Sequence, residues 1–154
     1  MTQTQRATAP SHTPHRSPYL GRLSELLNLT APLRSEKELA AIVEARVAPE
    51  TVDSLAQAGL TSKELALVLP PRTLSHRRAK GGMLSVDESD RAVRVARMIA
   101  LAEAVFSNGD LALRWLRKPI RRFGDRTPLE MLVTEASGRL IEELLIQIDE
   151  GYGA

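Results

Sequence analysis

The residues best suited to chemistry in this sequence form a short basic run after a double proline. Residues 72–80 contain three arginines, one lysine, one histidine and two hydroxyl side chains, with no acid. Basic and hydroxyl groups bind phosphates, and the arginine fork can also bind a guanine edge. The run predicts DNA contact through Arg72, Thr73, Ser75, His76, Arg77, Arg78 and Lys80. The alternative is a solvated basic face without a ligand.

A second candidate is the acidic C-terminal end. Residues 140–150 carry four acids and no base, and the chain then ends in Gly-Tyr-Gly-Ala. Tyr152 stands between two glycines, which predicts a mobile tip with an amphipathic anchor. Such a tip suits entry into the cleft of a partner protein. The alternative is a helix end that simply frays.

Enzyme motifs are missing from the sequence. It has no HExxH, glycine-rich phosphate loop, nucleophile elbow or Cys/His pair. Glu142 and Glu143 are interpreted as a solvated outer face, because paired catalytic acids need opposed environments. His12 and His15 lie in a stretch where two histidines are more often solvated than bound to a metal. The sequence predicts no catalytic residue, no metal site and no cofactor.

Composition and length favour a cytoplasmic protein. The 154 residues include no cysteine and carry a formal net charge of +2. No apolar run approaches the roughly 20 residues that a membrane span needs, so no membrane partner is predicted. Residues 1–18 are rich in Thr, Ser, Pro and Gln and predict a disordered tail. Their three prolines argue against the amphipathic helix of an organelle transit peptide.

Helices must position the candidate residues, since no alternating β pattern appears. Apolar spacing and breakers predict helices over residues 19–29, 36–47, 49–58, 62–69, 72–80, 86–106, 109–118 and 135–150, with a further helical turn from Pro128. Helix-start pairs occur at Ser35/Glu38, Thr61/Glu64, Ser85/Glu88 and Thr127/Glu130. The predicted fold is an all-α helical bundle. Two short, tightly joined helices within residues 61–80, the second strongly basic, are typical of a helix-turn-helix.

Large side chains concentrate in residues 102–138, which hold the only tryptophan and both phenylalanines. Because each removes a large apolar area from water, we expect a core centred on Trp115, with Leu111 and Leu116 on the same side. The last helix is expected to turn Leu140, Ile141, Leu144, Leu145 and Ile148 inward. A second basic cluster is formed by Arg117, Lys118, Arg121 and Arg122, and its residues alone do not indicate a role.

Two motifs in this order carry a family resemblance that spans roughly Ala48 to the C-terminus. The first comprises Arg72-Thr73-Leu74, Arg77, Gly82, Leu84 and Glu88-Ser89-Asp90-Arg91. The second comprises Ala102, Phe106, Ala112, Trp115-Leu116, Pro119, Gly124, Thr127-Pro128, Leu132 and Gly138. Together they resemble the Xre/ParS/MbcA-type antitoxins. The double proline before Arg72 departs from the usual turn of the family's Cro/repressor-like helix-turn-helix.

The resemblance implies the antitoxin of a type II toxin–antitoxin pair. It implies a tail (1–18), a DNA-binding and dimerisation region (19–99) and a toxin-binding domain (100–154). The implied partners are operator DNA, a second copy within a hetero-oligomer, and a RES-domain toxin that degrades NAD or transfers ADP-ribose. The implied toxin-binding residues are Trp115, Arg117, Glu143, Gln147, Asp149, Glu150, Gly151 and Tyr152, with the C-terminal segment blocking the toxin's active site. A stand-alone helix-turn-helix regulator and a protein-only adaptor stay open as alternatives.

Overall fold

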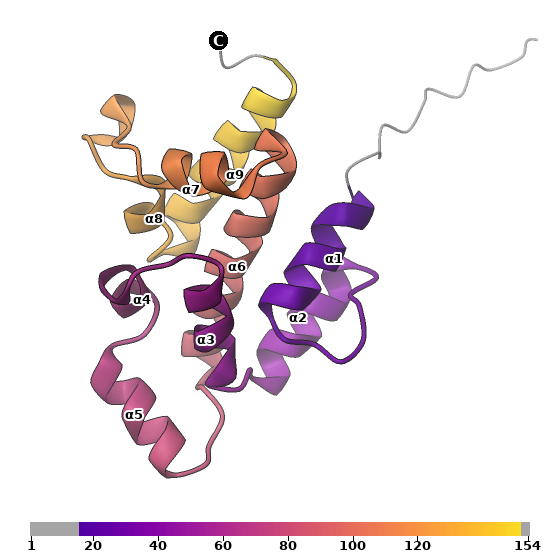
Figure 1. Ribbon diagram of the computed structural model, residues 1–154, viewed down its shortest axis with the longest axis vertical. Coiled ribbons are helices and arrows are strands. Elements are labelled where there is room, and N and C mark those ends of the chain that lie inside the picture. Colours follow the sequence, from indigo (N-terminus) through magenta and orange to yellow (C-terminus); the bar gives the residue numbers. More distant parts are fainter. Residues whose placement is uncertain (1–15, 152–154) are drawn as a thin grey trace, which may run out of the picture.

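The computed structural model describes residues 16–151, and every regular element within them is a helix (Figure 1). The elements are α1 (Arg16–Leu26), α2 (Glu36–Ala45), α3 (Glu50–Gln57), α4 (Ser62–Val68), α5 (Pro71–Ala79), α6 (Val86–Phe106), α7 (Gly109–Leu116), a 3-10 turn (Arg121–Phe123), α8 (Pro128–Met131) and α9 (Glu135–Asp149). An isolated bridge joins Ile120 to Arg126. The all-α fold predicted from the sequence is confirmed.

The predicted capping boxes explain where several helices begin. Thr61, Ser85 and Thr127 each accept a hydrogen bond from the backbone of the glutamate three residues on, and that carboxylate binds the cap's own backbone N–H. The prediction of a capping box at Ser35 and Glu38 is half right. Ser35 does accept from the Glu38 backbone, but the Glu38 carboxylate binds the backbone and side chain of Arg34 instead.

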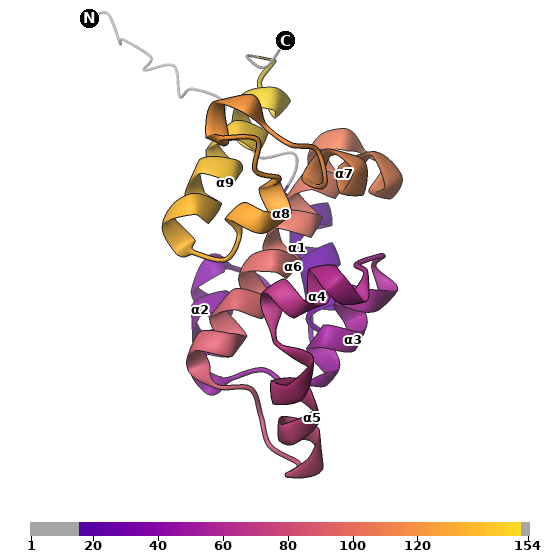
Figure 2. The same cartoon turned by 90° about the vertical axis from the view of Figure 1, so that its left-hand side faces the viewer.

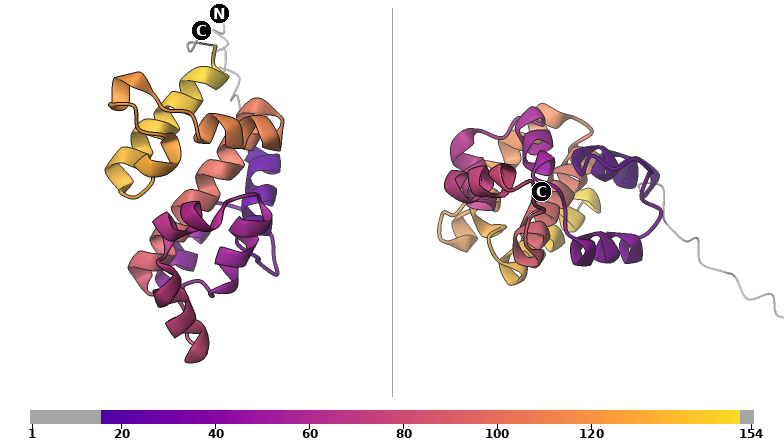
Figure 3. Two further views of the ribbon diagram at one scale, coloured as in Figure 1. Left: turned by 60° about the vertical axis from the view of Figure 1, so that its left-hand side comes forward. Right: turned by 90° about the horizontal axis from the view of Figure 1, so that it is seen from below.

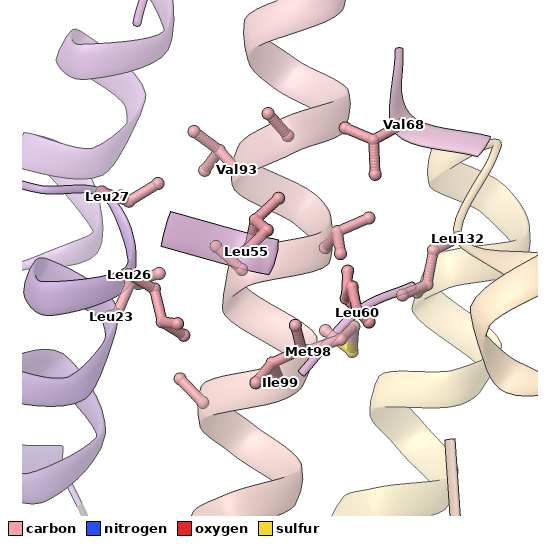
Figure 4. Close-up of a cluster of buried hydrophobic side chains, with 14 of the residues drawn as sticks. Leu23, Leu26, Leu27, Leu55, Leu60, Val68, Val93, Met98, Ile99 and Leu132 are labelled. Atoms are coloured by element: carbon pink, nitrogen blue, oxygen red, sulfur yellow. The ribbon is translucent and has the colours of Figure 1, made fainter. Parts of the chain in front are cut away.

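α6 is the central helix, and α1 to α4, α7 and α9 pack on it. In Figure 1, α1 and α2 lie on one side of it and α7 to α9 on the other, while α3 and α4 pack nearer its start. Alanines 92, 96 and 102 on α6 are fully buried, and their small size lets neighbouring helices approach closely. Figure 4 shows Leu23 and Leu26 of α1 facing Met98 and Ile99 of α6, with Leu132 on the opposite side.

Two arginines of α6 tie it to the ends of neighbouring helices. Arg91 donates to the carbonyl of Val68, which ends α4, at 3.1 Å. Arg94 donates to the carbonyl of Leu132, which follows α8, at 3.0 Å. Both carbonyls lie at helix ends, where no partner within the helix is available. Each arginine therefore satisfies a helix end while fixing it to α6.

Arg97 brings three further helices together. It donates to the Tyr19 hydroxyl of α1 at 3.1 Å and to both carboxylate oxygens of Glu142 of α9 at 3.0 and 2.6 Å. The Tyr19 hydroxyl in turn donates to Glu36 of α2 at 3.4 Å. Burial raises the pKa of Tyr19 to about 12, so this donor stays protonated. The expectation that Glu142 lies on a solvated face is wrong, because Arg97 engages its carboxylate.

The region after α6 is not centred on its tryptophan. Trp115 is half-buried and packs against Phe106, with ring centroids 5.8 Å apart. The fully buried positions of α7 are Ala112 and Leu116, which are one helical turn apart and face the core. Leu111 precedes Ala112 and does not share its buried face. It is 44% exposed, contrary to expectation.

α9 packs on α6 through a glycine. A Cβ at Gly138 would lie 3.1 Å from the Cδ of Arg94, so the two helices approach closely there. Ile141 and Leu145 are fully buried on the same side of α9, as expected. Leu140 is 43% exposed, so the prediction that it faces inward is wrong.

Candidate nucleic-acid interface and partner surface

α4 and α5 form the tightly joined helix pair expected from the sequence. Leu69 and Pro70 are extended between them, and Pro71 occupies the first turn of α5, where its missing N–H costs nothing. Gly81 closes α5 with a positive φ of 61°, and Gly82 donates to the carbonyl of Arg77 at 3.0 Å. That pattern ends the helix with its last carbonyls satisfied.

α5 stands at one end of the molecule. Three views place it at the end of the long axis opposite the end of α9 (Figures 1 and 2, and the left panel of Figure 3). It is the one α-helix in the described residues without a buried side chain, and Leu74 is its only apolar residue packed on the core. Such a helix offers most of its circumference to a ligand.

The structure divides the predicted DNA-binding residues into two groups. Arg72, Ser75, His76 and Lys80 are exposed, while Thr73 and Arg77 are half-buried. Arg77 donates from Nε and Nη2 to the two carboxylate oxygens of Glu88 at 3.2 and 2.9 Å. Arg78 is exposed but donates to Asp53 of α3 at 2.6 Å. Neither ion pair has a local sequence signal, since the acids are 11 and 25 residues away.

Glu88 has two structural roles at the start of α6. It caps the helix by accepting from the Ser85 backbone at 2.8 Å, and it binds the Arg77 fork. Hydrogen bonds from Arg77, followed by that from the Ser85 backbone, lower the pKa of Glu88 against the opposing effect of burial. The carboxylate is therefore ionised at neutral pH, and α5 is tied to a fixed point on α6.

A junction connects the helix-turn-helix to the region that follows α6. Arg117, at the end of α7, donates to both Glu64 oxygens at 2.9 and 2.8 Å and to the carbonyl of Gly59 at 2.8 Å. Gly59 has a φ of +113°, and a Cβ there would lie 2.7 Å from the Cδ1 of Leu113. The Arg117 hydrogen bonds lower the pKa of Glu64. Arg117, predicted to bind a partner, is thus engaged within the chain.

The exposed end of α9 contains most of the other predicted partner-binding residues. Glu143, Gln147, Asp149, Glu150 and Gly151 are all exposed. Ile146 is also exposed and adds an apolar side chain that sequence analysis did not select. Trp115 lies on α7, a different helix packed on α6. Tyr152 lies outside the described residues.

The second basic cluster lies around the 3-10 turn. Lys118, Arg121 and Arg122 are exposed, and the Arg122 guanidinium lies 5.0 Å from the centroid of the Phe123 ring. Within residues 16–151 there is no group of three or more His, Asp or Glu side chains suited to a metal ion. His12 and His15 lie outside that range. None of the helices in the described range is both long enough and apolar enough to cross a bilayer.

The fold and these surfaces define a class of protein: an all-helical type with a basic helix-turn-helix at one end and a further helical module at the other. Residues 38–97 match the Antitoxin Xre-like helix-turn-helix domain. Residues 101–151 match the Antitoxin Xre/MbcA/ParS C-terminal toxin-binding domain. A relative named Antitoxin Xre from Pseudomonas putida is 41% identical over 136 residues, covering 88% of this chain and 85% of the relative. The chain belongs to the Xre antitoxin family, whose members are regulatory proteins rather than enzymes.

Two further relatives agree over about half of their length. An Antitoxin Xre from Yersinia enterocolitica is 32% identical over 85 residues, covering 54% of this chain and 57% of the relative. One from Photorhabdus laumondii is 35% identical over 81 residues, covering 52% and 55%. The family resemblance inferred from the sequence motifs is confirmed. The chain is an antitoxin with a helix-turn-helix, and its family implies a toxin as partner.

Proposed function

We propose that this antitoxin neutralises a RES-domain toxin with its C-terminal region and represses its own operon through α5. The observation that carries the proposal is the placement of the two surfaces. The basic helix α5 and the acidic end of α9 lie at opposite ends of the molecule (Figure 2). One chain can therefore hold DNA and a protein partner at the same time without steric conflict.

The DNA-binding arm rests on charge and exposure. Arg72 and His76 on α5 and Lys80 at its C-terminal end are exposed, and the sequence of α5 contains no acid. Basic side chains on an exposed helix bind phosphates and release counterions, which makes binding weaken as salt rises. Binding to a palindromic operator calls for two copies of the helix, so we propose a homodimer within the toxin complex.

The toxin-binding arm rests on the negative charge at the end of α9. A RES toxin that consumes NAD or transfers ADP-ribose must hold a pyrophosphate, so its cleft is expected to be basic. Asp149 and Glu150 are exposed at the helix end and complement such a cleft. The surface of α7 to α9 would supply most of the contact area, while the tip would exclude substrate. The tip needs to contribute little binding free energy, because its presence in the toxin's cleft is enough to exclude substrate.

The functional division we propose places DNA binding and dimerisation in residues 19–99 and toxin binding in residues 100–154. The cytoplasm is the proposed compartment, because operator DNA and NAD are found together there. The boundary falls inside α6, which runs without interruption from Val86 to Phe106. Both regions therefore share one helix.

The test is co-expression with the product of the adjacent open reading frame, followed by purification, an NAD-consumption assay and a gel shift with upstream DNA. We expect a stable complex, an inactive toxin and operator binding that weakens with salt. A complex that binds no DNA at low salt would favour the protein-only adaptor. Operator binding without any co-purifying toxin would favour the stand-alone regulator.

A further inference from the structure

We infer that Arg77 positions α5 rather than reading DNA itself: its ion pair with Glu88 sets the angle at which α5 presents Arg72, Ser75 and His76. This inference rests on the proposed DNA binding and makes it specific to individual side chains. It divides a run of similar basic residues into one that holds the helix and others that contact the ligand.

The first observation is that packing alone fixes α5 weakly. None of its residues is buried, and Leu74 is the only apolar side chain of α5 that packs on the core. A nine-residue helix is too short to be stable by itself in water. Its orientation must therefore depend strongly on the polar contacts that connect it to the rest of the fold.

The second observation is the geometry of the Arg77–Glu88 pair. Two nitrogens of one guanidinium bind two oxygens of one carboxylate, an arrangement that fixes direction as well as distance. The Glu88 side chain is only 14% exposed and is also held by the Ser85 backbone. Arg77 is thus anchored to the start of α6. Arg78, by contrast, pairs with Asp53 through a single nitrogen, and both of these side chains are about half exposed.

The third observation is the direction of each side chain around α5. Residues 72, 75 and 76 follow helical spacing and are all exposed. Arg77 lies on the side that faces α6, and its fork is already occupied by an acid. A base or phosphate contact from Arg77 would have to break that pair first.

Two interpretations of Arg77 predict opposite effects for Glu88→Gln. If Arg77 contacts DNA, the substitution frees its fork and removes a negative charge close to the phosphates, so operator binding tightens. If Arg77 positions α5, the substitution loosens the helix and sequence discrimination falls. Glutamine still caps α6, since Gln serves as well as Glu at the third helical position. Glu130→Gln is the matched control, because Glu130 caps α8 in the same way and α8 lies in the region that follows α6.

The experiment measures the affinity of full-length antitoxin for an upstream-operator duplex and a scrambled duplex at several salt concentrations. For Glu88→Gln and Arg77→Met we expect the ratio of the two affinities to fall about tenfold, the size of losing one base contact. The salt slope should stay unchanged, because no phosphate contact is lost. Tighter operator binding by Glu88→Gln, an unchanged ratio, or a salt slope reduced in Arg77→Met would each overturn the inference.

A second readout needs no DNA and separates this inference from the proposed function. Hydrogen exchange of the α5 amides should be faster in Glu88→Gln than in wild type and unchanged in Glu130→Gln. If the wild-type protein binds no DNA, the proposed operator binding fails, while faster exchange still supports the positioning contact. Equal exchange in Glu88→Gln and wild type would show that α5 does not depend on this pair. Melting curves of each variant confirm that it is folded.

Discussion

Arg117 at the end of α7 and Glu64 in the first turn of α4 form a two-nitrogen, two-oxygen ion pair across 53 residues of sequence. The pair connects the helix-turn-helix to the toxin-binding module, and Glu64 caps α4 at the same time. The carboxylate is 15% exposed and the arginine 40%, so the contact lies at the edge of the structure.

The pH dependence of stability should report on this pair and on Glu88. Hydrogen bonds from arginine lower the pKa of both carboxyls below the unfolded value. The resulting stability is present above about pH 4.5 and is lost as the pH falls through the folded pKa values. Melting temperature should therefore fall below that pH, and Glu64→Gln should flatten the fall. Equal acid sensitivity in wild type and Glu64→Gln would contradict the assignment.

Arg117→Ala should lower the unfolding free energy by about 1 kcal/mol at neutral pH, since solvent screens a partly exposed pair. Urea denaturation measures this change. Arg122→Ala is a suitable control, because Arg122 is exposed, lies over the Phe123 ring and forms no side-chain hydrogen bond or ion pair within residues 16–151. A large loss of toxin binding with no loss of stability would instead favour Arg117 as a toxin contact.

Gly59→Ala should destabilise the protein by about 1–3 kcal/mol, because the new Cβ combines a positive φ with a clash. The Cβ would lie 2.7 Å from Leu113, where α7 approaches the turn before α4. Gly81→Ala is the matched control, with a positive φ but nothing within 4 Å. It should cost about 1 kcal/mol. Similar losses in the two variants, measured by urea denaturation, would show that the contact with Leu113 relaxes easily.

Truncation of residues 149–154 should restore toxin activity while leaving much of the complex intact. The acidic end of α9 is proposed to block the cleft, and α7 to α9 are proposed to supply the area. Glu150→Lys should have the same effect through charge repulsion. The measurements are NAD consumption or ADP-ribose transfer beside a pull-down for each variant. Full inhibition by the truncated antitoxin would mean that another surface closes the site.

Local sequence signals predicted the helices well, because caps, prolines and glycines act over three or four residues. The starts at Thr61, Ser85 and Thr127 followed directly from such signals. The candidate DNA surface could also be selected, since a run of basic residues without acidic residues is visible in the sequence. The sequence did not show which of these basic side chains already form ion pairs within the protein. Glu88 and Asp53 are brought to Arg77 and Arg78 only by the fold.

The burial of side chains was predicted less well for the same reason. Trp115 was expected at the centre because it is large, yet the direction in which α7 meets α6 places Ala112 and Leu116 there. Leu140 was expected inside because it is apolar, but Ile141 and Leu145 occupy the buried face of α9 and Leu140 is 43% exposed. Helix orientation depends on contacts between distant segments, which periodicity within one helix does not contain.

The arginines of α6 have a consequence for how the protein unfolds. Arg91 holds the end of α4, Arg94 holds the carbonyl after α8, and Arg97 holds α1 and α9. The two functional regions thus lose their anchors together when α6 melts, and they form a single cooperative folding unit. A protease cut within α6 is expected to abolish the proposed operator and toxin binding in one event. On the proposed function, loss of α6 would therefore end repression and inhibition of the toxin together.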